Sequence, residues 1–131
     1  MAETLMICSK GTMNAINSSL LTATMLKGQG VDVAVFFYQE AVVSFAERKF
    51  EIPPLLAKYT ETMFRNIGKT GLPTDTMEIL KMAKGAGVPV YICSIWADIL
   101  DVRDKLPAEL EVVETADAVK LFAEAKRHIG A

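Results

Sequence analysis

The chain has 131 residues, of which 51% are hydrophobic, and its 14 basic and 16 acidic side chains give a formal net charge of −2. A chain of this length fits one domain with a sizeable core, here residues 1–131, and the apolar fraction favours a sheet covered on both faces or extensive subunit contacts. The balanced charge indicates neither a nucleic-acid partner nor an anionic membrane surface.

The N-terminus and the cysteine count indicate a cytoplasmic protein. Met1-Ala2-Glu3 has no basic stretch ahead of a long apolar run, so no signal peptide is expected. The longest strongly apolar stretch, residues 33–38, is too short to span a bilayer. Two cysteines do not form a disulfide framework in a chain of this size, which favours a reducing compartment.

The first part of the chain alternates between strand and helix patterns. Residues 5–8 form an apolar run, and residues 13–27 repeat apolar side chains at helical spacing until Gly28 and Gly30, which end a helix readily. The β-branched and aromatic run at 31–38 is typical of a central parallel strand. The expected elements are strands at 5–8 and 31–38 and helices at 13–27 and 39–48.

The second part continues this alternation after an interruption at Ile52-Pro53-Pro54, where neither proline can donate a backbone hydrogen bond. Asp75 and Glu78 have the spacing of a capping box. Thr115 is positioned to cap a final helix whose basic end includes His128. The expected elements are helices at 55–67, 75–84, 95–102 and 115–127, a loop at 68–73, and strands at 88–93 and 111–113.

This order of elements predicts an α/β fold with right-handed crossovers between parallel strands. We expect a three-layer α/β/α sandwich around a mostly parallel sheet of four to five strands. Ligands of such sheets bind beyond the carboxyl ends of the strands. That rule selects residues 8–12, 38–40 and 93–98, and both cysteines fall in these segments, each in an Ile-Cys-Ser tripeptide.

Cys93 is the main candidate for a catalytic residue. It lies where a strand turns directly into a helix, so its sulfur can face the free amides of that helix, a setting that stabilises a thiolate. Ser94 is positioned to cap the helix, and Trp96 and Asp98 lie in its first turns. The alternative is that Cys93 is a small buried hydrophobic side chain, the commonest fate of a free cysteine.

Cys8 allows the same two interpretations, and here a buried structural role is favoured over a direct role in catalysis. The residue sits inside an apolar strand, with no helix starting directly beside it. A role as a resolving partner for Cys93 requires that the strands of the two cysteines are neighbours.

The other motifs predict neither a cofactor nor a metal. Ser9-Lys10-Gly11-Thr12 lacks the glycine spacing of a P-loop, and no GxGxxG fingerprint follows the first strand. We interpret this segment as a tight strand-to-helix turn with Lys10 in solvent. One histidine excludes a His-based metal cluster, and the seven methionines are more typical of core filling than of a soft-metal site.

Three segments resemble the DsrE/DsrF-like family (the DsrE/F/H superfamily) of sulfur-relay proteins. They are the Ser9-Lys10-Gly11-Thr12 turn after the first strand, Val35-Phe36-Phe37 with the polar turn that follows it, and residues 87–98, GVPVYICSIWAD. The family pattern in the last segment is G-V-x-x-x-x-C with an aspartate five residues after the cysteine. The resemblance extends over nearly the whole chain.

The resemblance implies a three-layer α/β sandwich that assembles as a trimer or a hexamer. It also implies a persulfide on Cys93, with Asp98 in the adjoining helix, and a sulfurtransferase or sulfur-carrier role in intracellular sulfur relay. The partners would then be donor and acceptor proteins of sulfur, without a nucleic acid or a membrane span.

One alternative of the same fold is a noncatalytic, oligomeric module that binds a small ligand or regulates another protein through the strand-end pocket. Another is a subunit whose apolar excess only builds an interface.

Overall fold

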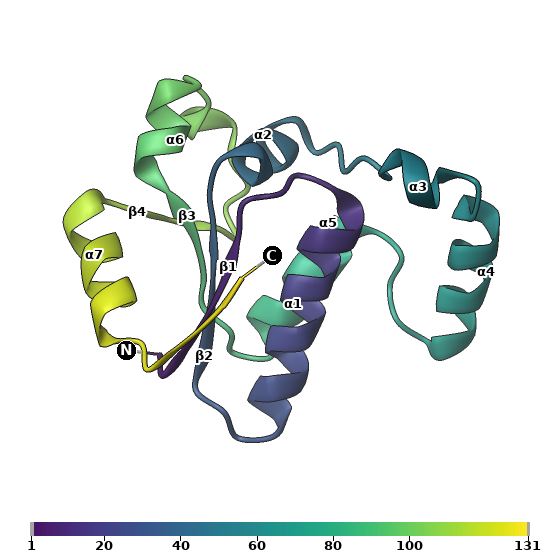
Figure 1. Ribbon diagram of the computed structural model, residues 1–131, viewed down its shortest axis with the longest axis horizontal. Helices are drawn as coiled ribbons and strands as arrows, with labels where there is room; N and C mark the ends of the chain where they lie inside the picture. Colours follow the sequence, from purple (N-terminus) through teal and green to yellow (C-terminus); the bar gives the residue numbers. More distant parts are fainter. Residues whose placement is uncertain (1, 131) are drawn as a thin grey trace.

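The computed structural model describes residues 2–130, and its centre is a five-stranded sheet in the order β4-β3-β2-β1-β5 (Figure 1). Every neighbouring pair of strands is parallel. This confirms the predicted α/β class, at the upper end of the expected strand number. The strands are β1 (Thr4–Cys8), β2 (Val33–Phe37), β3 (Val90–Cys93), β4 (Glu111–Val113) and β5 (Arg127–Gly130).

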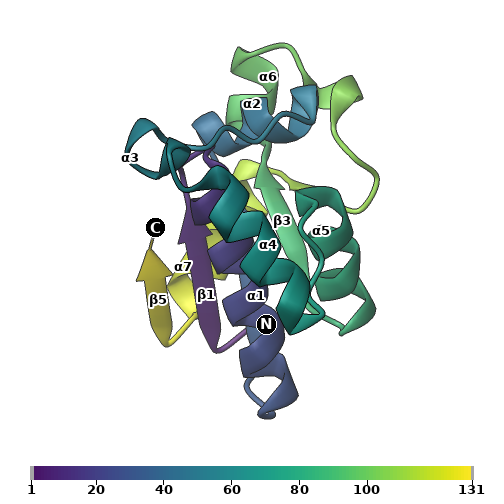
Figure 2. The ribbon, with the colours of Figure 1, turned by 90° about the vertical axis from the view of Figure 1, so that its right-hand side faces the viewer.

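Helices surround this sheet and complete a three-layer arrangement. Helices α1 and α5 lie on one face, α7 lies on the other, and α2 and α6 lie beyond the carboxyl ends of the strands (Figures 1 and 2). The helices are α1 (Met13–Gly28), α2 (Glu40–Glu47), α3 (Pro54–Ala57), α4 (Thr60–Thr70), α5 (Thr76–Gly85), α6 (Ser94–Ile99) and α7 (Thr115–Glu124), with a short 3₁₀ helix η1 (Arg103–Lys105).

The larger core lies between the sheet and the α1–α5 pair. Ile16, Leu20 and Ala23 follow helical spacing along one side of α1 and are completely buried. They pack in one cluster with the inward side chains of β2, including Phe37. This face of the sheet is therefore closed by two helices.

The opposite face carries a smaller core under a single helix. Leu5, Ala34 and Phe36 alternate along β1 and β2 with the side chains of the larger core, and they meet Leu121 of α7. Because one helix is too narrow to cover five strands, parts of this face stay open on either side of α7.

The strand register places the carboxyl ends of four strands next to one another. Cys8 pairs with Phe37, Phe37 pairs with Ile92, and Cys93 pairs with Val113. The carboxyl ends of β1, β2, β3 and β4 therefore lie side by side, as the sequence analysis expects for a ligand-binding edge.

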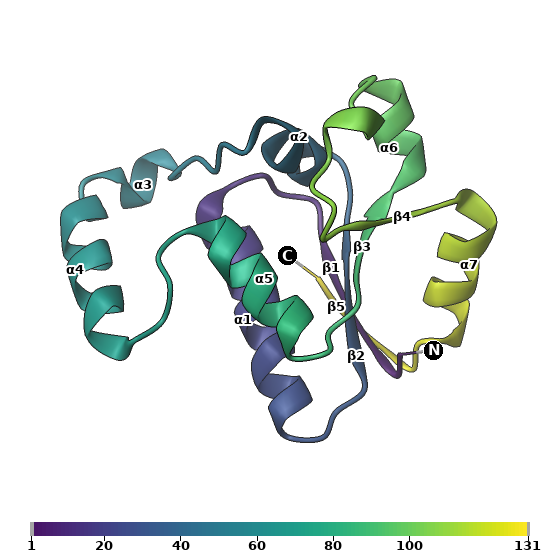
Figure 3. The same cartoon turned by 180° about the vertical axis from the view of Figure 1, so that it is seen from behind.

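Residues 54–73 form an arm, which we define as α3, α4 and the following turn. Helix α4 lies outside the α1–α5 layer, away from the sheet (Figures 1 and 3). None of its side chains is buried, although its apolar residues share one side of the helix. Leu55 of α3 is 82% exposed. The predicted helix at 55–67 is thus two helices, because Pro54 starts α3 as a first-turn proline and α4 begins anew at Thr60.

The C-terminal segment differs from the prediction. Helix α7 ends at Glu124, and residues 127–130 form β5 instead of the expected end of a helix. The backbone N–H groups of Lys126 and Arg127 both donate to the Glu3 carbonyl, at 2.8 and 3.0 Å, which directs the chain alongside β1. His128 is therefore a strand residue, although its Nε2 lies 2.9 Å from the Phe122 carbonyl in the last turn of α7.

Two predicted helix starts are placed differently. Ser94 is the first residue of α6 and Cys93 holds the N-cap position, while Glu114 rather than Thr115 holds the N-cap position of α7. The Asp75 half of the predicted capping box is confirmed, since its carboxylate accepts from the Met77 N–H at 3.2 Å, whereas the Glu78 carboxylate pairs with Lys81 at 3.5 Å. No helix within residues 2–130 combines the length and apolar character needed to cross a membrane.

Candidate functional site

Cys93 ends β3, an inner strand between β4 and β2, and faces the α7 side of the sheet. Its thiol is free and half-buried. The backbone is extended (φ −72°, ψ 122°), and the side chain makes no capping hydrogen bond to α6. Cys93 therefore has a free thiol that is not fully buried in the core.

An apolar groove of about 560 Å³, which we call the Cys93 groove, opens beside this thiol between the sheet and α7. Of the described residues that line it, none is charged. Its walls include Phe36, Tyr38, Ile95, Val113, Val119 and Phe122.

Aromatic packing holds the walls of the Cys93 groove in place. The Phe36 ring on β2 meets Phe122 of α7 edge to face, with ring centroids 5.1 Å apart. Tyr38 packs against Phe36 at 6.2 Å. Such aromatic pairs add stability beyond the area that they bury. The groove is therefore formed by the folded core rather than by a mobile loop.

A charged network lies at the end of this groove. Arg103 donates two hydrogen bonds of 2.8 Å to the Asp98 carboxylate and one of 2.7 Å to Glu114. Hydrogen bonding to Arg103 lowers the pKa of Asp98, and it lowers the pKa of Glu114 with a smaller contribution from the Ser94 hydroxyl. Asp98 is thus engaged by Arg103, a partner that the sequence analysis missed.

Cys8 lies apart from Cys93. Strand β2 separates their strands, and the two side chains belong to the cores on opposite faces of the sheet. The condition for a resolving partner is therefore not met. The Cys8 thiol is buried and donates to the Lys10 carbonyl at 3.5 Å, and its burial raises the pKa of the thiol. Cys8 is a core residue, as its leading interpretation predicts.

The early turn also lies away from the Cys93 groove. Ser9 and Trp96 line a separate hollow of about 540 Å³ together with Gln39 and Glu40 at the start of α2. Trp96 packs against the larger core, so it does not shield the Cys93 thiol from this position. Lys10 is exposed, as expected.

Gly11 and Thr12 line a third hollow, of about 300 Å³, against α2. The Ser44 hydroxyl donates to the Gly11 carbonyl at 2.6 Å, which fastens the turn to that helix. Of the supporting residues predicted from sequence, only Ser94 lines the same groove as Cys93. Among residues 2–130, no group of three His, Cys, Asp or Glu side chains is arranged to hold a metal ion.

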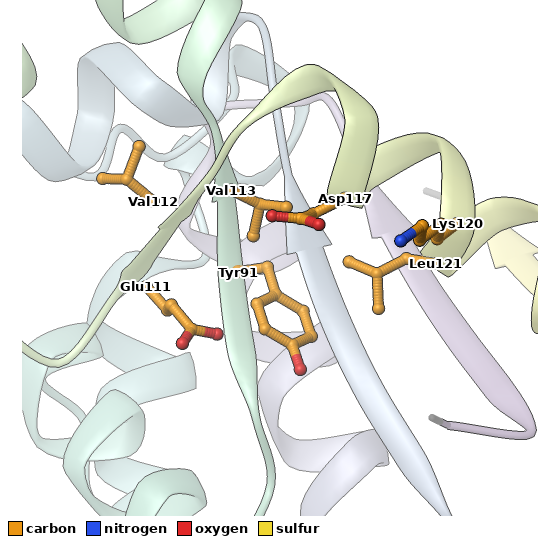
Figure 4. A pocket seen from close by; sticks show the side chains of 7 residues that line it. All are labelled: Tyr91, Glu111, Val112, Val113, Asp117, Lys120 and Leu121. Atoms are coloured by element: carbon orange, nitrogen blue, oxygen red, sulfur yellow. The ribbon is translucent and has the colours of Figure 1, made fainter.

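Sequence analysis missed a hollow of about 280 Å³ around Tyr91, on the same face as Cys93 (Figure 4). Glu111, Asp117 and Lys120 place charged groups around the phenol, and Val113 lines both this hollow and the Cys93 groove. The pKa of Tyr91 is raised by burial and then by the charges of Glu111 and Asp32. The alternation of side chains along β3 was the available signal, since residues 91 and 93 of a strand share a face.

Comparisons with known proteins support the fold assignment and carry no information on the chemistry of the site. No family model matches the chain, and no curated protein matches it significantly. The structure of the ychN protein from E. coli superimposes with a TM-score of 0.68 at 17% identity and covers 100% of both chains. A conserved protein of unknown function from Bacteroides thetaiotaomicron, BT1422, superimposes with a TM-score of 0.66 at 10% identity, covering 98% of this chain and 95% of its own. The chain shares the fold of these proteins.

Proposed function

We propose that the protein is a sulfurtransferase or sulfur carrier that holds sulfur as a persulfide on Cys93. The observation that supports this most directly is a free, half-buried thiol at the carboxyl end of a central strand, beside an apolar groove of about 560 Å³. The resemblance of the Cys93 segment to the DsrE/DsrF-like family points to the same chemistry, and the shared fold agrees with it.

The reaction needs two exchange steps at one sulfur. The Cys93 thiolate attacks the outer sulfur of a donor persulfide, the donor S–S bond breaks, and the donor leaves as a thiolate. An acceptor thiolate then attacks the outer sulfur of the Cys93 persulfide, the new S–S bond forms, and Cys93 leaves as a thiolate. Each step keeps the number of electrons and sulfur atoms constant, so no external oxidant takes part.

The test is intact mass spectrometry after exposure to excess inorganic polysulfide. We expect the parent protein to gain whole sulfur atoms that a reductant removes. The Cys8→Ser variant should gain the same atoms because Cys8 is buried on the opposite face. The Cys93→Ser variant should gain none. Absence of loading in the parent, or loading that ignores Cys93, contradicts the proposal.

We further propose that the protein acts as a homo-oligomer, a trimer or hexamer, in the cytoplasm. The arm carries exposed Leu55 and Tyr59 together with Lys58, Arg65 and Lys69 against one acid, Glu61. Residues 98–124 carry eight acidic and three basic side chains. These opposite charges favour contact between the arm of one copy and this acidic segment of a second copy.

The Tyr91 hollow favours a second candidate function, a noncatalytic module that binds a small ligand. A phenol, two carboxylates and an ammonium group around about 280 Å³ suit a zwitterion such as an amino acid. Thermal stabilisation of the Cys93→Ser variant by an amino acid, with no sulfur loading in the parent, would favour this function over the sulfur carrier. Stabilisation lost in a Lys120→Met variant would locate the ligand.

A further inference from the structure

We propose that the sulfur donor of Cys93 carries an uncharged, apolar substituent, which lies in the Cys93 groove during transfer. The inference rests on the proposed function and names its substrate class: organic persulfides R–S–SH with an apolar R group, in preference to anionic donors such as thiosulfate.

The first support is the chemistry of the groove walls. The described lining residues offer aromatic rings, methyl groups and a few hydroxyls, and no side chain that could pair with an anion. An anionic donor would lose its hydration there without gaining a partner. An apolar substituent instead gains about 0.8 kcal/mol for each methylene group that it buries.

The size of the groove gives the second support. A volume of about 560 Å³ is within the range of small-molecule sites and far exceeds what a single sulfur atom occupies. The space extends from Cys93 along α7 to Val119 and Phe122. A donor therefore has room for a substituent behind its reacting sulfur.

The third support is the charge at the end of the groove. Arg103 binds two carboxylates, those of Asp98 and Glu114, and Glu114 stands between the groove residues Val113 and Thr115 in the chain. Two carboxylates around one guanidinium leave a net negative charge beside Ser94. This charge disfavours a donor whose substituent adds a further negative charge, relative to a donor whose substituent is uncharged.

The transfer step fixes the geometry that the substituent must satisfy. The Cys93 thiolate attacks the outer sulfur of R–S–SH, the S–S bond of the donor breaks, and R–S⁻ leaves with the bonding pair, while Cys93 keeps the outer sulfur as a persulfide. Because attack and departure lie in line, R points away from the Cys93 sulfur, and the groove is the apolar space next to it.

The experiment uses alkyl methanethiosulfonates, in which the Cys93 thiolate forms a disulfide to the alkyl sulfur and methanesulfinate leaves. The alkyl group stays on the sulfur bound to Cys93, so the rates report whether the space beside the thiol accepts an apolar or an anionic group. The propyl reagent is neutral, the sulfonatoethyl reagent is anionic, and the leaving group is the same. Rates are measured by intact mass on a Cys8→Ser background and divided by the rates of a neutral cysteine amide in solution. We expect a normalised preference for the propyl reagent of roughly tenfold, the effect of burying about two methylene groups.

A positive charge placed in the groove should reduce this preference. Val119 lines the groove and is 61% exposed, so Val119→Lys is compatible with folding, and Ile95→Lys is a second variant at 45% exposure. Either variant should lower the propyl preference several-fold by accelerating the anionic reagent. Met25→Lys is the matched control, because Met25 is 65% exposed on α1 and lies outside the groove. It should leave the ratio unchanged.

Equal normalised rates for the two reagents, or a Val119→Lys ratio equal to that of Met25→Lys, would overturn the inference. Benzyl persulfide and glutathione persulfide then separate it from the function itself. Loading of Cys93 mainly by benzyl persulfide supports both proposals. Equal loading by both donors, or loading mainly by glutathione persulfide, retains the sulfur carrier and rejects the apolar donor. Loading by neither persulfide rejects the apolar donor, and absence of loading by polysulfide as well rejects the sulfur carrier.

Discussion

Gly11 sits where the first turn of the chain touches α2, and it leaves no room for a side chain. A Cβ atom there would lie 2.5 Å from the Ser44 hydroxyl and 2.8 Å from the Glu40 carbonyl. The glycine of the Ser9-Lys10-Gly11-Thr12 turn therefore has a packing explanation, since it allows the turn and α2 to approach each other.

We expect Gly11→Ala to lower the free energy of unfolding by about 1–3 kcal/mol, the usual cost of overpacking a tight contact. Urea unfolding followed by circular dichroism measures this change. Gly28→Ala is the control, because nothing lies within 4 Å of a Cβ atom at the end of α1. That substitution should leave stability equal or slightly higher. A Gly11→Ala protein as stable as the control would refute the close contact.

The ion pairs of Arg103 should make the stability of the protein depend on pH. Arg103 holds the pKa values of Asp98 and Glu114 below their ordinary values of 3.8 and 4.5. A lowered folded-state pKa stabilises the fold above the ordinary value, and this stabilisation disappears as the pH falls through the lowered pKa. We expect Arg103→Gln to move both pKa values upward in a carboxylate NMR titration and to weaken the loss of stability below about pH 4. Lys105→Gln should change neither, and equal titrations in both variants would contradict the network.

At the scale of elements, the cap of α5 carries a separate prediction. The Asp75 carboxylate accepts from the Met77 N–H, which otherwise has no partner in the first turn of the helix. Asp75→Ala should therefore lower the free energy of unfolding by about 0.5–2 kcal/mol in thermal or urea unfolding. Asp75→Asn keeps an acceptor and should retain most of the stability. Equal losses in both variants would show that the cap is not the cause.

The sequence predicts the inner strands well because a parallel sheet buried on both faces requires continuous apolar runs. The observed β1, β2 and β3 agree with these runs to within two residues at either end. Strand β5 was not predicted, since it has no apolar run and its side chains are exposed and mostly polar. It becomes a strand through backbone pairing with β1, a tertiary effect that no local pattern encodes.

The site is predictable only in part for a related reason. The sequence pattern identifies Cys93 as the end of a strand and Asp98 as an acidic residue in the helix that follows. The face to which Cys93 points, the separation from Cys8 by β2 and the engagement of Asp98 by Arg103 all depend on strand order and register. The hollow around Tyr91 was missed because it needs β4 and α7 to meet beside β3.

The whole molecule leaves apolar surface uncovered in the arm and beside α7. We expect sedimentation to give a mass that is a trimeric or hexameric multiple of the 14.3 kDa chain. Replacing Leu55 and Tyr59 of the arm by aspartate should shift the protein toward monomer, because both side chains are exposed and both charges repel the acidic segment of another copy.

Met25→Asp is the control for this prediction, since Met25 is an exposed apolar side chain away from the arm. It should leave the assembly intact. A parent protein that sediments as a monomer at all concentrations would remove the oligomer from the proposal.

The pairing of β5 with β1 has a consequence for protein synthesis. Strand β1 leaves the ribosome early, and its outer edge can pair only after residues 127–130 have been translated. Until then the nascent chain presents an apolar strand with unpaired N–H and C=O groups, the feature that templates aggregation between neighbouring chains. Strand β5 therefore closes this edge last, after nearly all of the chain has been translated.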